Sequence, residues 1–575
     1  MLDLALAIYK YICMPVVHIH GQEQHISHSK TQVLIKSQLI ISHHVSLHRK
    51  QTMESFYYLA AVTLVLLVLL HHLLMGRRKR RRLPPGPRFA LPILGHLPLL
   101  KKKPLYASLA DLAARYGPAV HLRFGGRHAV VVGTAALAKE CFSGDLDIAI
   151  ANRPHFPSVR EASFDYSVLT LANYGAAWRT MRRVATVNLL SAHRVNIMSD
   201  NVISRELRAM ARRLARASAA APGGAARVEL KRRLFELSHS VLMEIMAQTR
   251  NTYSNDDDED MSKEAREMKN IFDVIVPLVG VANLWDYMPL LRWFDVYGVK
   301  KKLRDAVNRR NTFIYKMIDA EREKLEQLER KNGEGDANNS DEKKSMIGVM
   351  LSLQKTEPDV YPDTFISALV ANLLGTGTET TSTTLEWTMA LLLQHPNVLK
   401  KAQEEIDLNV GGGRLPDKND LPHLPYLHCI INETLRLYPA APLLLPHEAS
   451  TDCKIHGYDV PAGSLVLVNA HAIHRDPATW EDPEEFRPER FEHGGAEGKF
   501  MIPFGMGRRK CPGENLAMRT MGLVLGVLLQ CFDWSRIGDG EIGMATGTGP
   551  VMFKAVPLEA LCKPRANMST ILTKI

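Results

Sequence analysis

One cysteine stands in a setting that suits a reactive thiolate. Cys511 lies in a loop rich in glycine and arginine, FGMGRRKCPG at residues 504–513, and a long apolar stretch with helical spacing begins near Glu514. A thiol at the N-terminus of a helix meets unpaired backbone N–H groups and the positive end of the helix dipole, and both favour the thiolate. Pro512 suits the first helical turn, where its missing N–H does no harm. The competing interpretation is a buried cysteine in a glycine-bearing turn.

Two further spacings bring polar residues onto one face of a helix. Glu433 and Arg436 are three positions apart in the segment ETLR, and Trp178 and Arg182 are four positions apart in WRTMR. Taken alone, the first spacing ordinarily means a surface ion pair and the second a packing contact. Their significance comes from their order in the chain, because ETLR is followed by a PERF segment and then by the cysteine loop.

Together, these segments resemble the cytochrome P450 superfamily. The family pattern F-x-x-G-x-R-x-C-x-G is met at Phe504, Gly507, Arg509, Cys511 and Gly513. Five specified residues at fixed spacing rarely occur by chance, so the match is specific. The resemblance extends in family order from Pro84 to Arg565. It implies a mainly α-helical fold with minor β sheets, arranged as a single large haem domain.

The resemblance also implies roles for individual residues. It makes Cys511 the ligand of the iron of haem b, where the thiolate donates electron density to the metal. Contacts with the haem are implied for Trp178, Arg182, His447, Phe504, Arg509 and Gly513. His447 stands where many relatives carry arginine, and an exposed histidine is the competing interpretation. Gly507 and Gly513 are expected to let the backbone approach the flat macrocycle, and a buried triad of Glu433, Arg436 and Arg490 to support the loop in a purely structural role.

A threonine-rich segment completes the set of motifs. Residues 375–381, GTGTETT, match the family pattern A/G-G-x-D/E-T-T/S from its second position, whereas Thr376 stands where alanine or glycine is usual. The resemblance implies that Thr380 holds water beside bound O2 and that Glu379 relays protons to it. A core helix distorted by threonine side chains is the competing interpretation. Both interpretations agree with a helix that opens locally near Gly377.

The implied activity is that of a haem-thiolate monooxygenase. Segments such as ANRP at 151–154 resemble plant microsomal members, closest to isoflavone 2'-hydroxylases, and favour a small flavonoid-like or xenobiotic substrate. The alternatives are an O2-independent rearranging haem-thiolate enzyme and a non-catalytic haem-binding sensor. Retention of both Glu379 and Thr380 favours the monooxygenase. By analogy, the substrate contacts should come from residues 164–172, 372–373, 441–444 and 548–551.

Electrons must come from another protein. The chain has no G-x-G-x-x-G fingerprint after a strand and no flavin motif, so the expected partner is an NADPH-cytochrome P450 reductase. Four bases near the cysteine loop are expected to meet its acidic face, namely Arg179, Arg183, Arg508 and Lys510.

An apolar stretch and a run of bases predict a membrane anchor. Residues 56–75 are almost wholly apolar over about the length of a bilayer core, and six bases follow at 77–82. This pattern predicts a single-pass protein of the endoplasmic reticulum that contacts membrane lipid and whose haem domain faces the cytosol. Because much of the net charge of +11 lies in this run, we do not expect nucleic acid as a partner.

The sequence indicates three consecutive regions. Residues 1–52 are atypical and read as an upstream extension of the gene model, 53–83 as the anchor with its basic stop, and 84–575 as the haem domain, which starts with a stiff proline-rich connector. Seven scattered cysteines predict neither a disulfide framework nor a zinc site. Within the haem domain we expect a short strand at 129–133, long helices at 363–394 and 514–530, and exposed loops at 251–260 and 331–344.

Overall fold

The computed structural model divides the chain into two compact units, residues 1–81 and 82–575. It describes residues 57–60, 62–63, 65–66, 81–91, 93–100, 104–249, 261–278, 284–287, 298–332, 344–538 and 540–575. The few described residues of the expected anchor are helical, and the rest of 56–75 lies outside the described residues, as do 1–52 and the expected loop at 251–260. Across the described ranges, no helix is long and apolar enough to cross a membrane.

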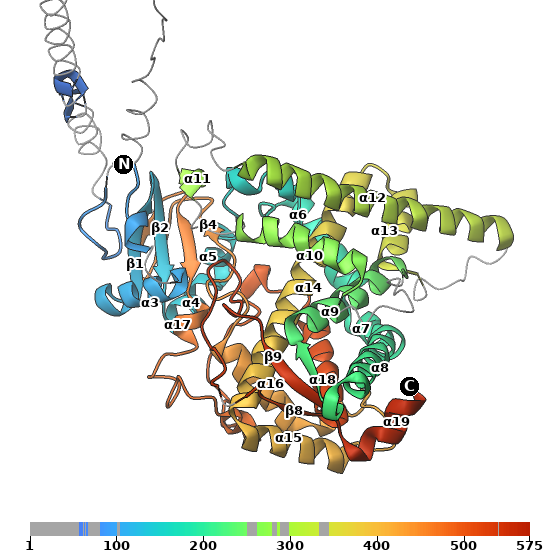
Figure 1. The fold of residues 1–575 in the computed structure, drawn as a ribbon. Coiled ribbons are helices and arrows are strands. Elements are labelled where there is room, and N and C mark those ends of the chain that lie inside the picture. Colours follow the sequence, from blue (N-terminus) through green and yellow to red (C-terminus); the bar gives the residue numbers. More distant parts are fainter. Residues whose placement is uncertain are drawn as a thin grey trace, which may run out of the picture. The chain divides into compact units, whose positions relative to one another are not determined.

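The unit 82–575 is mainly helical with small sheets, which confirms the predicted fold class (Figure 1). Its longer helices are α8 (Ser204–Ala220), α9 (Leu230–Ala247), α10 (Lys263–Ile275), α12 (Val299–Asn332), α13 (Met346–Thr356), α14 (Asp363–Gln394), α15 (Pro396–Asn409), α16 (Pro425–Leu437) and α18 (Glu514–Cys531). The shorter helices are α3 (Leu105–Tyr116), α4 (Ala135–Cys141), α5 (Gly144–Ala149), α6 (Ala176–Arg183), α7 (Ala192–Met198), α11 (Leu284–Tyr287), α17 (Ala470–Ile473) and α19 (Ser569–Lys574). Because α12 continues to Asn332, the first two residues of the loop expected at 331–344 are helical, and 333–343 lie outside the described residues.

Three small sheets accompany the helices. The largest has the strand order β1 (Ala119–Phe124), β2 (Arg127–Val132), β7 (Leu465–Val468) and β4 (His447–Glu448). A second joins β3 (Ala226–Glu229), β9 (Glu559–Pro564) and β8 (Phe532–Ser535), and a third pairs β5 (Cys453–Ile455) with β6 (Tyr458–Val460). The strand predicted at 129–133 lies in β2, which pairs antiparallel with β1 and parallel with β7.

Helix α14 forms the centre of the unit and has the predicted bounds. Nearly every side chain from Ile366 to Leu393 outside the threonine-rich segment is buried, as expected of a helix that is apolar on all faces. The expected opening near Gly377 is not observed, because α14 is continuous there. A Cβ at this glycine would lie 2.9 Å from Leu242 Cδ1, so the glycine serves the close approach of α9 instead.

The proline-rich connector is non-helical, as predicted, but it is not a free spacer. The carbonyl of Pro85 accepts a hydrogen bond from the N–H of His121 at 2.8 Å, and Asp459 N–H donates to Arg82 O at 2.8 Å. A Cβ at Gly86 would lie 2.1 Å from the carbonyl oxygen of His121, so this approach requires glycine. Prolines lack an N–H but keep their carbonyl acceptors, and the connector therefore packs as part of the unit.

Candidate active site

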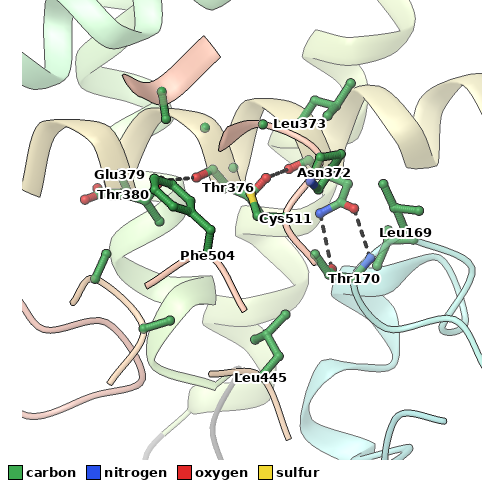
Figure 2. Close-up of a pocket in the computed structure, with 18 of the residues that line it drawn as sticks. Leu169, Thr170, Asn372, Leu373, Thr376, Glu379, Thr380, Leu445, Phe504 and Cys511 are labelled. Atoms are coloured by element: carbon green, nitrogen blue, oxygen red, sulfur yellow. Dashed lines mark hydrogen bonds between the residues drawn. The ribbon is translucent and has the colours of Figure 1, made fainter. Parts of the chain in front are cut away.

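A cavity of about 420 Å³ lies inside the unit, lined by α14 and by the loop that carries Cys511 (Figure 2). Most of its lining side chains are apolar. All four segments expected to contact substrate contribute to the lining, through Val168, Leu169, Thr170, Leu171, Asn372, Leu373, Ala441, Leu444, Pro550 and Val551. Its size and apolar character suit a small hydrophobic ligand beside a larger bound group.

The cysteine loop presents its thiol to the cavity. The N–H of Cys511 donates to Phe504 O at 2.8 Å, and the exposed surface of the cysteine belongs to the cavity that it lines. Burial raises the pKa of the thiol, whereas the Gly513 N–H and Arg182 lower it. Pro512 was expected in the first helical turn, and this prediction is wrong. Helix α18 begins at Glu514, so the proline precedes its first turn.

Asp147 of α5 holds the other side of this loop. Its carboxylate accepts a hydrogen bond from Arg508 N–H at 3.1 Å. A Cβ at Gly507, whose φ is +68°, would lie 2.6 Å from Asp147 Oδ1. Gly507 therefore serves the turn and its contact with Asp147; it is not among the residues that line the cavity, whereas Gly513 is. Sequence reasoning missed Asp147, because no motif marks it.

Three arginines line the cavity without an acidic partner. Arg153, Arg182 and Arg509 form no ion pair with any described residue. Arg153 donates to Leu445 O and Pro446 O, both at 2.7 Å. Arg509 donates to the carbonyl groups of the loop that precedes α6 and to Ala151 O at 2.7 Å.

The electrostatics of this arginine cluster call for an anionic ligand. Burial followed by repulsion from Arg509 lowers the pKa of Arg153 far below its usual value. Burial and then Arg182 lower the pKa of Arg509 to about 10. A ligand with two carboxylates would relieve this repulsion, and the propionates of haem b fit that requirement. Sequence analysis missed Arg153, although it named the segment that contains it.

Trp178 and His447 lie beside these arginines. The Trp178 indole N–H donates to Leu169 O at 3.1 Å, and its ring lies 4.4 Å below the Arg509 guanidinium. His447 is 2% exposed, so its interpretation as an exposed histidine is wrong. Burial and then Arg153 lower its pKa far below the usual value, which makes the ring neutral. Its Nδ1–H donates to Ile150 O at 2.9 Å, so His447 adds no positive charge.

The acid and threonine of α14 both reach the cavity. Thr380 Oγ1 donates to Thr376 O and Thr376 Oγ1 donates to Asn372 O, each at 2.7 Å (Figure 2). The Glu379 carboxylate lies 3.2 Å from the Nζ of Lys231 on α9. This lysine also donates to Thr383 Oγ1 at 2.9 Å. No motif in the sequence marks Lys231.

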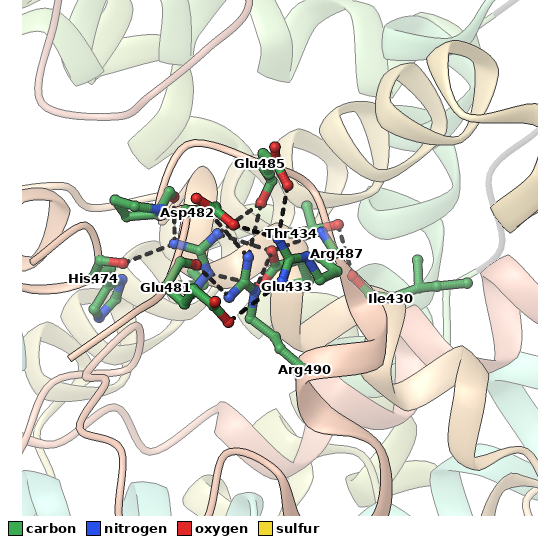
Figure 3. Close-up of polar contacts among 11 residues, drawn as sticks. Ile430, Glu433, Thr434, His474, Glu481, Asp482, Glu485, Arg487 and Arg490 are labelled. Atoms are coloured by element: carbon green, nitrogen blue, oxygen red, sulfur yellow. Dashed lines mark hydrogen bonds and ion pairs between the residues drawn. The ribbon is translucent and has the colours of Figure 1, made fainter. Parts of the chain in front are cut away.

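The expected charge triad is present and buried (Figure 3). Arg436 makes two hydrogen bonds to Glu433, at 2.7 and 2.8 Å, and Arg490 makes one at 2.9 Å. Arg436 also donates to His474 O at 2.9 Å, and His474 Nε2 accepts the N–H of Ile502 at 2.8 Å. His474 therefore links the triad to the chain that leads into the cysteine loop.

A helical unit whose cavity brings together a thiol, an acid–threonine pair and three arginines without acidic partners defines a haem-thiolate enzyme. Residues 84–560 match the family model Cytochrome P450, and the chain belongs to this family. As a member, it is a haem-dependent monooxygenase.

Two plant enzymes are similar to this chain over most of its length. The chain is 42% identical over 494 residues to cytochrome P450 81Q32 of Catharanthus roseus, covering 86% of this chain and 93% of the relative. It is 40% identical over 489 residues to isoflavone 2'-hydroxylase of Glycyrrhiza echinata, covering 85% and 93%. A structure of a zebrafish cytochrome P450 with abiraterone matches with a TM-score of 0.64 at 24% identity, over 80% of this chain and 100% of that one, and supports the fold.

Proposed function

We propose that this protein hydroxylates a small, mostly apolar aromatic substrate of flavonoid-like or xenobiotic type. The observation that carries the proposal is one apolar cavity that joins the Cys511 thiol to the Glu379–Thr380 pair. Two relatives support the substrate class, the isoflavone 2'-hydroxylase of Glycyrrhiza echinata and an isoflavone 3'-hydroxylase of Medicago truncatula that is 40% identical over 487 residues.

The residues around the thiol would hold the cofactor. Cys511 would bind the iron and Arg153, Arg182 and Arg509 the propionates. Phe504, Trp178, His447 and Gly513, which also line the cavity, would pack around the macrocycle. When bound, haem supplies the activation of O2 that inserts one oxygen atom into a C–H bond. The triad of Glu433, Arg436 and Arg490 fixes the loop through His474.

The polar residues of α14 would deliver protons. Thr380 would exchange its hydrogen bond to Thr376 O for one to a water molecule in the cavity and hold that water in place. Glu379 passes protons to that water, and Lys231 fixes the carboxylate in place. The apolar lining excludes other water, which keeps the site selective for the intended reaction.

Two partners would connect the enzyme to its surroundings. Arg179, Arg183, Arg508 and Lys510 are exposed near the cysteine loop and form a basic surface for the acidic face of an NADPH-cytochrome P450 reductase. The apolar segment 56–75 anchors the chain in the endoplasmic reticulum membrane, with the basic run holding the haem domain on the cytosolic side.

A reduced carbon-monoxide difference spectrum on microsomes tests the proposal. We expect the strongly red-shifted Soret band of thiolate ligation in the wild type, its loss in Cys511→Ser, and its retention in Cys453→Ser, a control at a partly exposed cysteine. With reductase and NADPH present, an isoflavone should gain one hydroxyl group. Haem-loaded protein without the red-shifted band, or a band with no oxidised product from any aromatic substrate tried, would contradict the proposal.

A further inference from the structure

A buried arginine of α12 also lines the cavity. Arg310 is 5% exposed and contributes to the lining. Its Nη1–H donates to Ala162 O at 2.7 Å, and its Nε–H and Nη2–H donate to Asn311 Oδ1 at 3.1 and 2.9 Å. The ring of Phe164 lies 5.0 Å from the guanidinium carbon. Because a guanidinium carries five N–H groups, two of them remain for another acceptor.

No carboxylate neutralises this arginine. Among the described residues, Arg310 forms no ion pair, whereas the buried Arg436 and Arg490 share Glu433. A buried charge is costly unless it is paired. Burial lowers the pKa of Arg310 to about 10, which still leaves it charged at neutral pH. The acceptors beside Arg310 are a neutral amide and a neutral carbonyl, so its positive charge is not neutralised and an anion could still bind.

Arg310 lies on a different element from the three arginines expected to bind the propionates. It belongs to α12, which runs along the top of the unit in Figure 1, whereas α18 behind the cysteine loop lies lower. Its contact Phe164 belongs to the segment 164–172 before α6 that was expected to touch substrate, and its contact Ala162 lies two residues before that segment. The cavity lining also includes the apolar Ile275 and Val276. A ligand that reaches Arg310 therefore meets a cation beside the apolar ring of Phe164.

We propose that Arg310 binds the acidic hydroxyl of a phenolic substrate, at the end of the molecule remote from the carbon that is oxidised. This inference rests on the proposed function and narrows its substrate class. Arginine favours an anionic oxygen through charge-assisted hydrogen bonds, and the low-polarity surroundings strengthen them. A site built to hydrogen-bond a hydroxyl discriminates strongly against an analogue without it, because the buried polar group is then left unpaired.

The test compares a matched pair of ligands, 7-hydroxyisoflavone and 7-methoxyisoflavone. Binding to the full-length, haem-loaded enzyme is measured by the ligand-induced shift of the Soret band. We expect the wild type to bind the hydroxy compound about 10- to 100-fold more tightly than the methyl ether. Arg310→Met should lose this preference and Arg310→Lys should keep part of it. Lys316→Met, which removes an exposed cation from the same helix, should leave it unchanged.

A merely structural role would give a different result. If Arg310 only joins α12 to Ala162, its replacement weakens both ligands equally and leaves the preference intact, which overturns the inference. A wild type that binds neither ligand, or both equally, also overturns it. Either result leaves the proposed function standing while the red-shifted carbon-monoxide band and turnover of another aromatic substrate persist. Loss of those two signals would contradict the proposed function instead.

Discussion

The buried cations of this protein differ in what neutralises them. Arg436 is wholly buried and shares the Glu433 carboxylate with Arg490, so this part of the fold satisfies its own charges. Arg153 and Arg310 are almost as buried but have only carbonyl and amide acceptors. Because carbonyl dipoles compensate a charge only in part, such positions indicate where a ligand supplies the missing anion. A buried arginine that pairs with a carboxylate of the same chain thus has a structural role, whereas a buried arginine without such a partner is a candidate for binding a ligand.

Lys231 is the residue whose replacement best tests the proton-delivery proposal. In Lys231→Met the Glu379 carboxylate loses its buried partner, so we expect about tenfold less product per NADPH consumed and a larger solvent isotope effect on turnover. Removing one member of a buried pair costs about 3–5 kcal/mol of unfolding free energy, so stability falls as well. Product, NADPH and hydrogen peroxide are measured together, because peroxide reports the electrons lost from hydroxylation.

Two controls separate chemistry from stability in this experiment. Lys231→Met combined with Glu379→Gln removes both charges and should recover stability but not product yield. Lys401→Met removes a partly exposed lysine that pairs with Glu492 and should cost about 1 kcal/mol or less, without changing the yield. Unchanged coupling in a stable Lys231→Met enzyme would show that the ion pair does not serve proton delivery.

The sequence predicted those site residues that belong to motifs and missed those that reach the site through tertiary contacts. Cys511, Glu379 and Thr380 are marked by neighbours a few positions away. Lys231 lies 148 positions from Glu379, and its segment carries no pattern that differs from an ordinary helix. Asp147 and Arg310 were missed for the same reason, since their partners lie in other elements. Long-range pairing requires the fold, which local spacing does not contain.

Among the elements, those with a strong apolar pattern were predicted best. The bounds of α14 match the prediction, and α18 extends one residue further. The errors involve features that depend on a neighbouring element. Gly377 was interpreted as a break in α14, but it accommodates Leu242 of α9. The proline-rich connector was interpreted as a spacer, but its carbonyl at Pro85 bonds to β1.

The link through His474 predicts that stability depends on pH. Burial, reinforced by Arg475, lowers the pKa of His474 to about 3, against about 6.5 in an unfolded chain. Below pH 6.5 the unfolded chain therefore binds a proton that the folded protein does not, so the unfolding free energy falls as pH falls. Between pH 7.5 and 5.5 this one group should remove about 1.4 kcal/mol. Urea unfolding at the two pH values measures the loss.

His474→Gln isolates this contribution from that of the other buried histidines. Its amide oxygen can still accept the Ile502 N–H but does not titrate in this range. We expect the variant to lose about 1.4 kcal/mol less than the wild type over the same pH interval. His471, His239 and His121 also have lowered pKa values, but they are present in both proteins and cancel in the comparison. Equal losses would show that His474 takes up its proton as readily in the folded protein as in the unfolded chain.

At the scale of the whole molecule, surface charge should control the supply of electrons. Arg179 and Arg183 are exposed on α6 beside the cysteine loop. Reversing both to glutamate should slow reductase-dependent haem reduction about tenfold at low salt, because complementary charge mainly raises the association rate. The difference should shrink as ionic strength rises.

A matched reversal on another helix controls for total charge. Arg309→Glu with Lys316→Glu makes the same change at two exposed positions of α12 and should leave the reduction rate within about twofold of the wild type. Stopped-flow absorbance in carbon monoxide measures the rate. If both double variants slow reduction equally, net charge rather than the basic surface near Cys511 guides the reductase.

Two deletions separate the anchor from the haem domain. The connector is bonded to β1 and to Asp459, so a chain that begins at Arg82 keeps its contacts and should retain the red-shifted carbon-monoxide band. Deletion of 1–52 should leave the protein in the carbonate-washed membrane fraction, because residues 56–75 remain. Deletion of 1–81 should release it. Retention of the shorter chain would instead assign membrane binding to the apolar surface just beyond the connector, where Phe89 and Ile93 are 86% and 70% exposed.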